Sequence, residues 1–285
     1  MIDLWHHAFV QNAFAAGAVV AVISGFTGYF VILRGQAFAC EALSHIGFAG
    51  AAGAALLGAG SLEGMFLFTL IAALGMGALG RRLQERDIEV GMVLSFVLGL
   101  GILFLSVYTQ HATRAVGVLF GSILSVTGGD LLTILASGAA ILLVLAVLYR
   151  PLLFASLQPE MAEARGVPVQ RISILFLLLL GLSVTVAIEV VGVLLVFALL
   201  VVPAAAAEQL TQRPWLAILT SVLISLCSTL GGLALAFIGH WPASFYVVSL
   251  TSLFYFVALL FHALRVPRHF RELPHPSREM LPPFR

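Results

Sequence analysis

Residues 171–207 read RISILFLLLLGLSVTVAIEVVGVLLVFALLVVPAAAA, and Glu189 is the only charged residue after Arg171. A helix of about 20 apolar residues is long enough to cross the hydrocarbon core of a bilayer. The stretch therefore predicts two consecutive membrane-spanning helices, over 171–188 and 190–207, with Glu189 between them.

Apolar runs of similar length recur along the chain. They lie at 13–33, 38–60, 62–80, 90–108, 131–149, 215–237 and 245–263. With the two runs above, they predict an all-α integral membrane protein, a polytopic bundle of about 8–9 transmembrane helices. Residues 115–127 are apolar but too short to cross comfortably, and we interpret them as a partly embedded or surface helix. Gly50, Ala54 and Gly58, spaced four apart, would let helix backbones approach closely.

The composition excludes a soluble enzyme. The 285 residues are 61% hydrophobic and 9% charged, with a mean hydropathy of +1.11, whereas an ordinary soluble domain is roughly 45–50% apolar. Every basic residue is an arginine, so the chain has no lysine for a phosphate-binding Walker-A loop, and any ATP would bind another chain. The net charge of +1 gives no sign of a nucleic-acid-binding surface.

The arginines divide unevenly between the two sides of the predicted bundle. With the amino terminus outside, only Arg114 of the fourteen arginines falls on the outer side. Because cytoplasmic loops of membrane proteins collect positive charge, we predict an outside amino terminus and a cytoplasmic carboxyl terminus. We divide the chain into a transmembrane domain, 1–263, and a Pro- and Arg-rich cytoplasmic tail, 264–285, which could touch anionic membrane lipid.

Glu41 and His45 form an ionisable pair inside a predicted span. Four residues apart, they share one helix face, and a carboxylate and an imidazole can ligate one divalent metal together. They could also form a buried polar cluster, in which Glu41 bonds to His45 or pairs with Arg34. Glu189 could be a polar turn residue near the outer surface or a ligand on the path of the metal.

Other polar residues have ordinary interpretations. Glu63 and Asp130 begin spans, where helix amino termini favour carboxylates. Cys40 and Cys227 lie in apolar runs, and we interpret them as small buried side chains without a disulfide or a metal. The sequence lacks the motifs of intramembrane proteases, so an enzyme would have no nucleophile or metal to act with. Transport is the simpler hypothesis.

Several motifs resemble those of the permeases of bacterial zinc and manganese ABC importers. Residues 41–50, EALSHIGFAG, are similar to the Asp-x-Leu-Ser-His start of their second helix. Residues 87–91, DIEVG, resemble their Asp-x-x-Ile-Gly segment, and residues 119–124, LFGSIL, resemble their Leu-Phe-Gly-x-Ile-Leu stretch. VGVLLV at 191–196, followed by PAAAA at 203–207, is similar to their Val-Gly-x-Leu-Leu-Val and Pro-Ala-Ala-x-Ala pair.

The resemblance implies a homodimeric permease in the cytoplasmic (inner) membrane of a bacterium that carries a divalent metal ion inward. It implies two partners, a separate ATPase subunit that binds ATP and an extracytoplasmic metal-binding protein, and no covalently bound cofactor. In that family the acidic residue and the histidine of the second-helix motif line the metal path, and here these are Glu41 and His45. Glu41 stands where Asp is usual, and its extra methylene could alter the metal preference. We favour zinc, with manganese or iron as alternatives.

The longest predicted cytoplasmic loop contains a short helix over 158–168, QPEMAEARGVP. Pro159 stands near its start, and Gly166 contributes to its stop. It resembles the coupling helix that docks on the ATPase of such importers. Its polar contacts would be Glu160, Glu163 and Arg165, and its packing residues Met161, Ala162 and Ala164. An ordinary surface helix is the alternative.

Three other functions fit parts of the sequence. An ion-coupled secondary transporter would act without an ATPase, so it predicts uptake by this chain alone. A permease for chelated iron or cobalamin usually has a longer chain with about one more span. A membrane scaffold leaves Glu41 and His45 unexplained inside an apolar helix.

Overall fold

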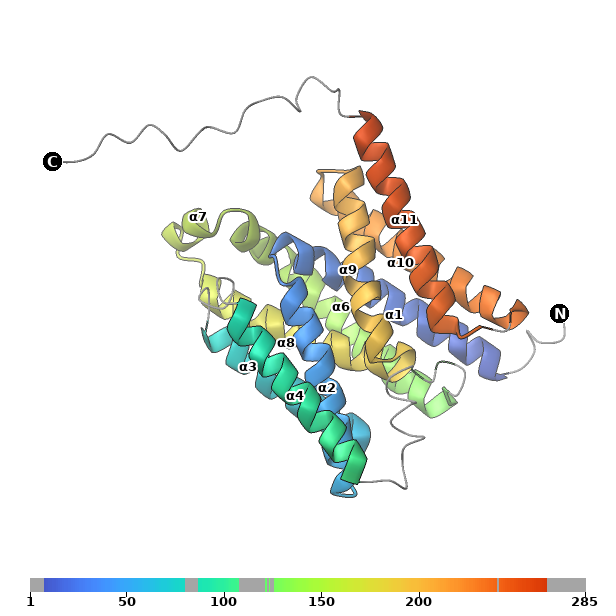
Figure 1. The fold of residues 1–285 in the computed structure, drawn as a ribbon. Coiled ribbons are helices and arrows are strands. Elements are labelled where there is room, and N and C mark those ends of the chain that lie inside the picture. Colours follow the sequence, from blue (N-terminus) through green and yellow to red (C-terminus); the bar gives the residue numbers. More distant parts are fainter. Residues whose placement is uncertain are drawn as a thin grey trace.

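The computed structural model describes residues 8–79, 87–107, 121, 123, 126–239 and 241–265. Within these residues the chain is mainly helical and contains no strand (Figure 1). The helices are α1 (Ala8–Leu33), α2 (Ala37–Leu56), α3 (Ser61–Leu79), α4 (Asp87–Val107), α6 (Gly128–Leu157), α7 (Pro159–Ala164), α8 (Val169–Val191), α9 (Val193–Leu210), α10 (Pro214–Ile238) and α11 (Ala243–Arg265).

Each predicted span coincides with one of the long helices, so the predicted fold class is confirmed. Among the described residues, 7 helices are long and apolar enough to cross a membrane: α1, α3, α6 and α8 to α11. α2 and α4 have comparable lengths of 20 and 21 residues. The stretch 115–127 lies largely outside the described residues. α11 continues to Arg265, just past the predicted boundary at 263, and the rest of the tail is also outside them.

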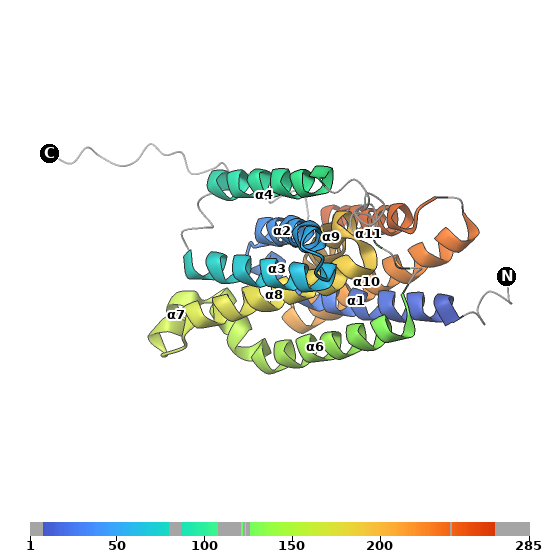
Figure 2. The ribbon, with the colours of Figure 1, turned by 90° about the horizontal axis from the view of Figure 1, so that it is seen from below.

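α1 and α8 occupy the interior of the bundle. In their most apolar windows 67% of α1 and 72% of α8 is buried, against 17% of α11. α1 packs against α6, α8, α9 and α10, while α8 packs against α2, α3 and α6. Figure 2 shows α4 and α6 on opposite sides of the bundle, with α2, α3 and α8 between them. Most exposed side chains of α11 are apolar, among them Leu253, Phe256 and Leu260, as expected of a helix that faces lipid. The exposed polar exceptions are Ser249 and His262.

Three short connections lie at one end of the bundle, which we call the basic end. They join α1 to α2, α6 to α8 through α7, and α9 to α10. Arg34, Arg165, Arg171 and Arg213 lie in or beside these connections. Because α2 begins at the basic end, Glu41 lies in the half of α2 that is closer to it.

A tight turn joins α1 to α2. The Gln36 amide donates to the Val31 carbonyl at 2.8 Å, and the Gly35 amide donates to the Ile32 carbonyl at 2.9 Å. This pair of bonds is a Schellman motif, which needs a left-handed residue after the helix. Gly35 provides it with a φ of 62°, because glycine adopts this conformation without strain. Arg34 is the capping residue and is therefore held in a fixed position between the two helices.

The close crossing of α2 and α3 depends on glycine. A Cβ atom added to Gly50 would lie 2.5 Å from the Gly64 carbonyl oxygen, and one added to Gly64 would overlap the backbone of Gly50 and the methyl group of Ala54. The predicted packing role of Gly50 and Ala54 fits this crossing. The prediction for Gly58 was wrong, because Gly58 ends α2 with a φ of 72° and has open space around it.

Candidate functional site

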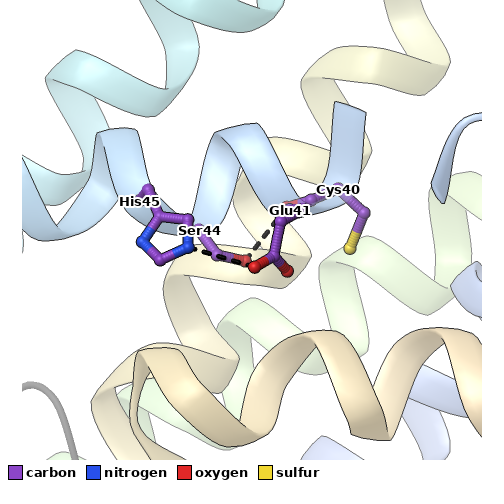
Figure 3. A network of polar contacts seen from close by, with 4 residues as sticks. All are labelled: Cys40, Glu41, Ser44 and His45. Carbon is purple, nitrogen blue, oxygen red and sulfur yellow. Dashed lines mark hydrogen bonds and ion pairs between the residues drawn. The ribbon is translucent and has the colours of Figure 1, made fainter. Parts of the chain in front are cut away.

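The predicted Glu41–His45 pair lies in the first half of α2. Glu41 is on the second turn, and His45 follows one turn later. Glu41 Oε1 and His45 Nε2 are 3.0 Å apart, and the two side chains point toward each other along one side of the helix (Figure 3). The Glu41 side chain is 32% exposed and the His45 side chain 19%. The pair is therefore partly open at the surface of the single chain.

The atoms next to the pair do not add a third ligand. Ser44 Oγ donates to the Cys40 carbonyl oxygen at 3.0 Å. The Cys40 thiol is buried, and it lies on the far side of Glu41 from His45 (Figure 3). In the part of the chain that the structure describes, no three His, Cys, Asp or Glu side chains are grouped to hold a metal ion. One chain thus offers a carboxylate and an imidazole.

The geometry of the pair suits a shared cation. Two ligands with metal bonds of about 2.1 Å that meet at a right angle are about 3.0 Å apart, which matches the observed distance between Glu41 Oε1 and His45 Nε2. His45 Nδ1 is buried and has no hydrogen-bond partner among the described residues. A cation shared by the pair would replace the Glu41–His45 hydrogen bond, and the two side chains would turn so that Nε2 and Oε1 are directed at the ion instead of at each other.

Arg34 has partners on two helices other than its own. Its Nη1 donates to Ser156 Oγ of α6 at 3.1 Å, and its Nη2 donates to Ser173 Oγ of α8. The guanidinium also lies over the ring of Phe176, 5.5 Å from the ring centre. Burial lowers the pKa of Arg34 from its ordinary value, but a guanidinium remains charged in proteins. These contacts could not be predicted from the sequence, because a serine in an apolar helix has the same local pattern whichever neighbour it faces.

Glu189 lies at the opposite end of the bundle from α7, near the end of α8. Its neighbour Ile188 packs beside Gly47, which follows His45 by half a turn on α2. Glu189 itself is half-buried. The structure does not group it with Glu41 and His45 among the described residues.

Asp130 closes the start of α6. Its amide donates to Thr127 Oγ1 at 3.3 Å, and its carboxylate accepts from the Thr127 amide at 3.0 Å. This reciprocal pair is a capping box, so Asp130 has the helix-starting role that we predicted. Glu63 lies in the first turn of α3, in agreement with the same prediction.

The predicted coupling segment 158–168 contains α7, which is six residues long. Gly166 ends it with a φ of 78°, and the Val167 amide donates to the Ala162 carbonyl at 2.9 Å. The side chains of α7 and its end that are exposed are Glu160, Met161, Glu163, Ala164 and Arg165. Ala162, one of the predicted packing residues, is fully buried within the chain. It packs in the same hydrophobic core as the long helices.

Two further polar contacts join the interior helices. Thr27 of α1 and Ser183 of α8 share a hydrogen bond at 3.2 Å, and Thr69 of α3 and Thr185 of α8 share one at 2.9 Å. They satisfy hydroxyl groups between helices in an apolar setting. Cys227 of α10, which we expected to be buried, is exposed because it lies on the outward face of that helix.

The chain is similar along most of its length to known transport proteins. The profile of the ABC 3 transport family matches residues 6–262. The manganese transport system membrane protein MntC of Halalkalibacterium halodurans is 31% identical over 91% of this chain and 89% of its own length. The manganese import system permease protein ScaB of Streptococcus parasanguinis is 33% identical over 81% of this chain and 82% of its own.

A solved structure has the same fold. PsaBC from Streptococcus pneumoniae, determined in complex with a Fab, superposes with a TM-score of 0.81 at 30% sequence identity. The match covers 90% of this chain and 94% of that chain.

Proposed function

This chain belongs to the ABC 3 transport family and is a permease of metal ABC transporters, and from that premise we propose that it carries manganese into the bacterial cytoplasm. The observation that carries the proposal is the Glu41–His45 pair, a carboxylate and an imidazole 3.0 Å apart inside a helix whose other residues, apart from Ser44, are apolar. Ionisable side chains within a membrane are costly and mark ion pathways by default.

We propose manganese, whereas the sequence alone favours zinc. Both relatives described above carry manganese in their names. The buried Cys40 thiol is turned away from the pair, so the ligands that the described residues offer at this point are oxygen and nitrogen. Carboxylates suit manganese, whereas thiolates would have favoured zinc.

A second copy of the chain completes the metal site in this proposal. Each chain supplies two ligands, and a manganese ion takes up to six, with water filling what the protein does not provide. The partly exposed faces of Glu41 and His45 leave room for another copy to approach them. A homodimer with the pairs facing each other would offer two carboxylates and two imidazoles.

The basic end is the cytoplasmic end in this proposal, because membrane proteins collect arginines on that side. There α7 presents Glu160, Met161, Glu163 and Arg165 to a separate ATPase subunit, with Gly166 ending the helix. Ala162 is buried and α7 contacts α6 and α8, so a displacement of α7 by the ATPase would also move these two helices.

Transport then proceeds by alternating access. An extracytoplasmic binding protein delivers the metal to the end of the bundle where α8 ends, and Glu189 lies on its route. Glu41 and His45 bind the ion within the membrane. ATP binding and hydrolysis on the ATPase move α7, and the path opens first to one side and then to the other. The two carboxylates and two imidazoles of the dimer bind the ion with moderate strength, so the ion can leave again, as conduction requires.

Uptake into proteoliposomes tests the proposal. The chain would be reconstituted with its ATPase and binding protein, and manganese, zinc and iron would be offered separately. ATP would be supplied either on the side of the membrane where the ATPase lies or on the opposite side. We expect ATP-dependent manganese uptake that His45→Ala and Glu41→Gln abolish. His262→Ala and Glu63→Gln, which change a histidine and an acid elsewhere, should keep it. Uptake by the chain alone would instead support an ion-coupled secondary transporter.

A further inference from the structure

α7 is joined to the bundle by the two helices on either side of it. Ser156 lies near the end of α6, shortly before α7 begins, and Ser173 lies in the second turn of α8, shortly after α7 ends. Arg34 donates a hydrogen bond to each of these serines, at 3.1 Å for Ser156. One guanidinium therefore spans both supports of α7.

The serine at the end of α6 is oriented to accept this bond. Ser156 Oγ donates its own hydrogen to the Leu152 carbonyl at 2.6 Å, which leaves its lone pairs for Arg34. The Phe176 ring beneath the guanidinium adds a second contact with α8, because cations are attracted to aromatic faces. A planar fork with several donors can satisfy this arrangement, whereas the single ammonium of a lysine cannot reproduce its geometry.

Arg34 is also tied to the helix that carries the metal-binding pair. It caps α1, and the Schellman bonds of Gly35 and Gln36 fix the turn that follows. The Cys40 amide donates to the Gln36 carbonyl at 3.0 Å, so the first turn of α2 is continuous with that turn. Glu41 is the next residue. The backbone from Arg34 to Glu41 is short, and the amides of Gly35, Gln36 and Cys40 along it are hydrogen-bonded.

We propose that Arg34 is a positioning residue that transmits the movement of α7 to the Glu41–His45 pair. This inference rests on the proposed function, in which the ATPase acts on α7. When α6 and α8 move with α7, the hydrogen bonds of Ser156 and Ser173 move the Arg34 guanidinium with them. The turn at Gly35 then moves the start of α2. The metal site then changes its access in step with ATP hydrolysis.

The fold does not depend on Arg34 alone. Phe30 of α1 packs edge-to-face against Tyr149 of α6 and against Phe176 of α8, each with ring centres 6.2 Å apart. These aromatic contacts hold the same three helices together beside Arg34. Loss of the hydrogen bonds should therefore leave a folded protein with weakened communication, and this difference can be measured.

The test is the number of manganese ions imported per ATP hydrolysed by the complex in proteoliposomes. The main variant is Ser156→Ala combined with Ser173→Ala, which removes both acceptors and keeps Arg34 and its charge. We expect manganese uptake to fall about tenfold, within the range of ordinary allosteric couplings, while ATP hydrolysis is retained. Arg34→Lys should show the same separation. Ser137→Ala is the matched control, since the bonds of Ser137 Oγ to described residues lie within α6, to the Thr133 and Ile134 carbonyl oxygens.

An unchanged ratio of manganese imported to ATP hydrolysed in the double variant would overturn the inference, whether both rates stay at the wild-type level or fall in proportion. In either case a wild-type complex that imports manganese leaves the proposed function intact. A wild-type complex that hydrolyses ATP but imports no manganese, zinc or iron would overturn the proposed function and this inference with it.

Discussion

Glu41 Oε1 lies 3.0 Å from His45 Nε2, one helical turn apart on α2 and on the half of that helix closer to the basic end. This relationship places two metal-ligand types at the spacing of adjacent ligands on one cation. Neither residue has another acid or histidine grouped with it in the described part of the chain. The site of one chain is therefore small, and its properties depend on the identity of each side chain.

Glu41→Asp should keep transport but change the metal that is preferred. The shorter side chain retains the carboxylate and withdraws it from His45 by about one carbon–carbon bond, which alters the size of cation that both ligands can reach. Uptake of radioactive manganese in competition with zinc would measure the ratio of the uptake rates of the two metals. An identical ratio in wild type and variant would mean that the carboxylate position does not control selectivity.

Gly64→Ala should destabilise the bundle, because the added methyl group would overlap the backbone of Gly50 on α2. Overpacking of this kind costs about 1–3 kcal/mol. Gly75→Ala is the control on the same helix, since a Cβ atom at Gly75 has open space around it and alanine favours helix by about 1 kcal/mol. Thermal unfolding in detergent should separate the two variants. Equal midpoints would contradict the close α2–α3 crossing.

Thr127→Ala should weaken the start of α6, because it removes the side chain that accepts from the Asp130 amide. The loss of such a cap costs about 1 kcal/mol. Thr127→Ser should retain the cap and the stability. Hydrogen exchange of the first turn of α6 would report the difference, and we expect transport to be unchanged because Asp130 serves the helix rather than the metal.

Met161→Asp should weaken binding of the ATPase without destabilising the permease. Met161 is 58% exposed on α7, and substitutions at such surface positions usually change stability by less than about 0.5 kcal/mol. Ala162→Leu is the contrasting variant. Because Ala162 is fully buried, the larger leucine side chain should lower the unfolding temperature. Co-purification with the ATPase and a thermal melt would measure both effects. Normal co-purification of Met161→Asp would indicate that another surface docks the ATPase.

The membrane helices could be predicted from the sequence because apolar run length is a direct consequence of bilayer thickness. The pairing of Glu41 with His45 was also predictable, since residues four apart on a helix are neighbours whatever surrounds them. Both inferences use information that is local in the chain. The same locality explains why Asp130 was correctly assigned to a helix start.

Contacts between distant helices could not be predicted in this way. Arg34 bonds Ser156 and Ser173, which are 122 and 139 residues further along the chain. A serine in an apolar run has the same local pattern whether it faces lipid, its own helix or another helix. The outward position of Cys227 escaped prediction for the same reason, because the direction a residue faces depends on tertiary packing. Gly58 was assigned to helix packing because the predicted span ran to residue 60, whereas α2 ends at Leu56.

The central claim is that Glu41 and His45 bind manganese between two copies of the chain. Equilibrium binding of manganese to the purified complex, with the bound metal counted per permease chain, tests it most directly. We predict one manganese ion for two chains, and the loss of that ion in Glu41→Gln but not in Glu63→Gln. One ion per single chain, or binding that Glu41→Gln leaves unchanged, would contradict the account.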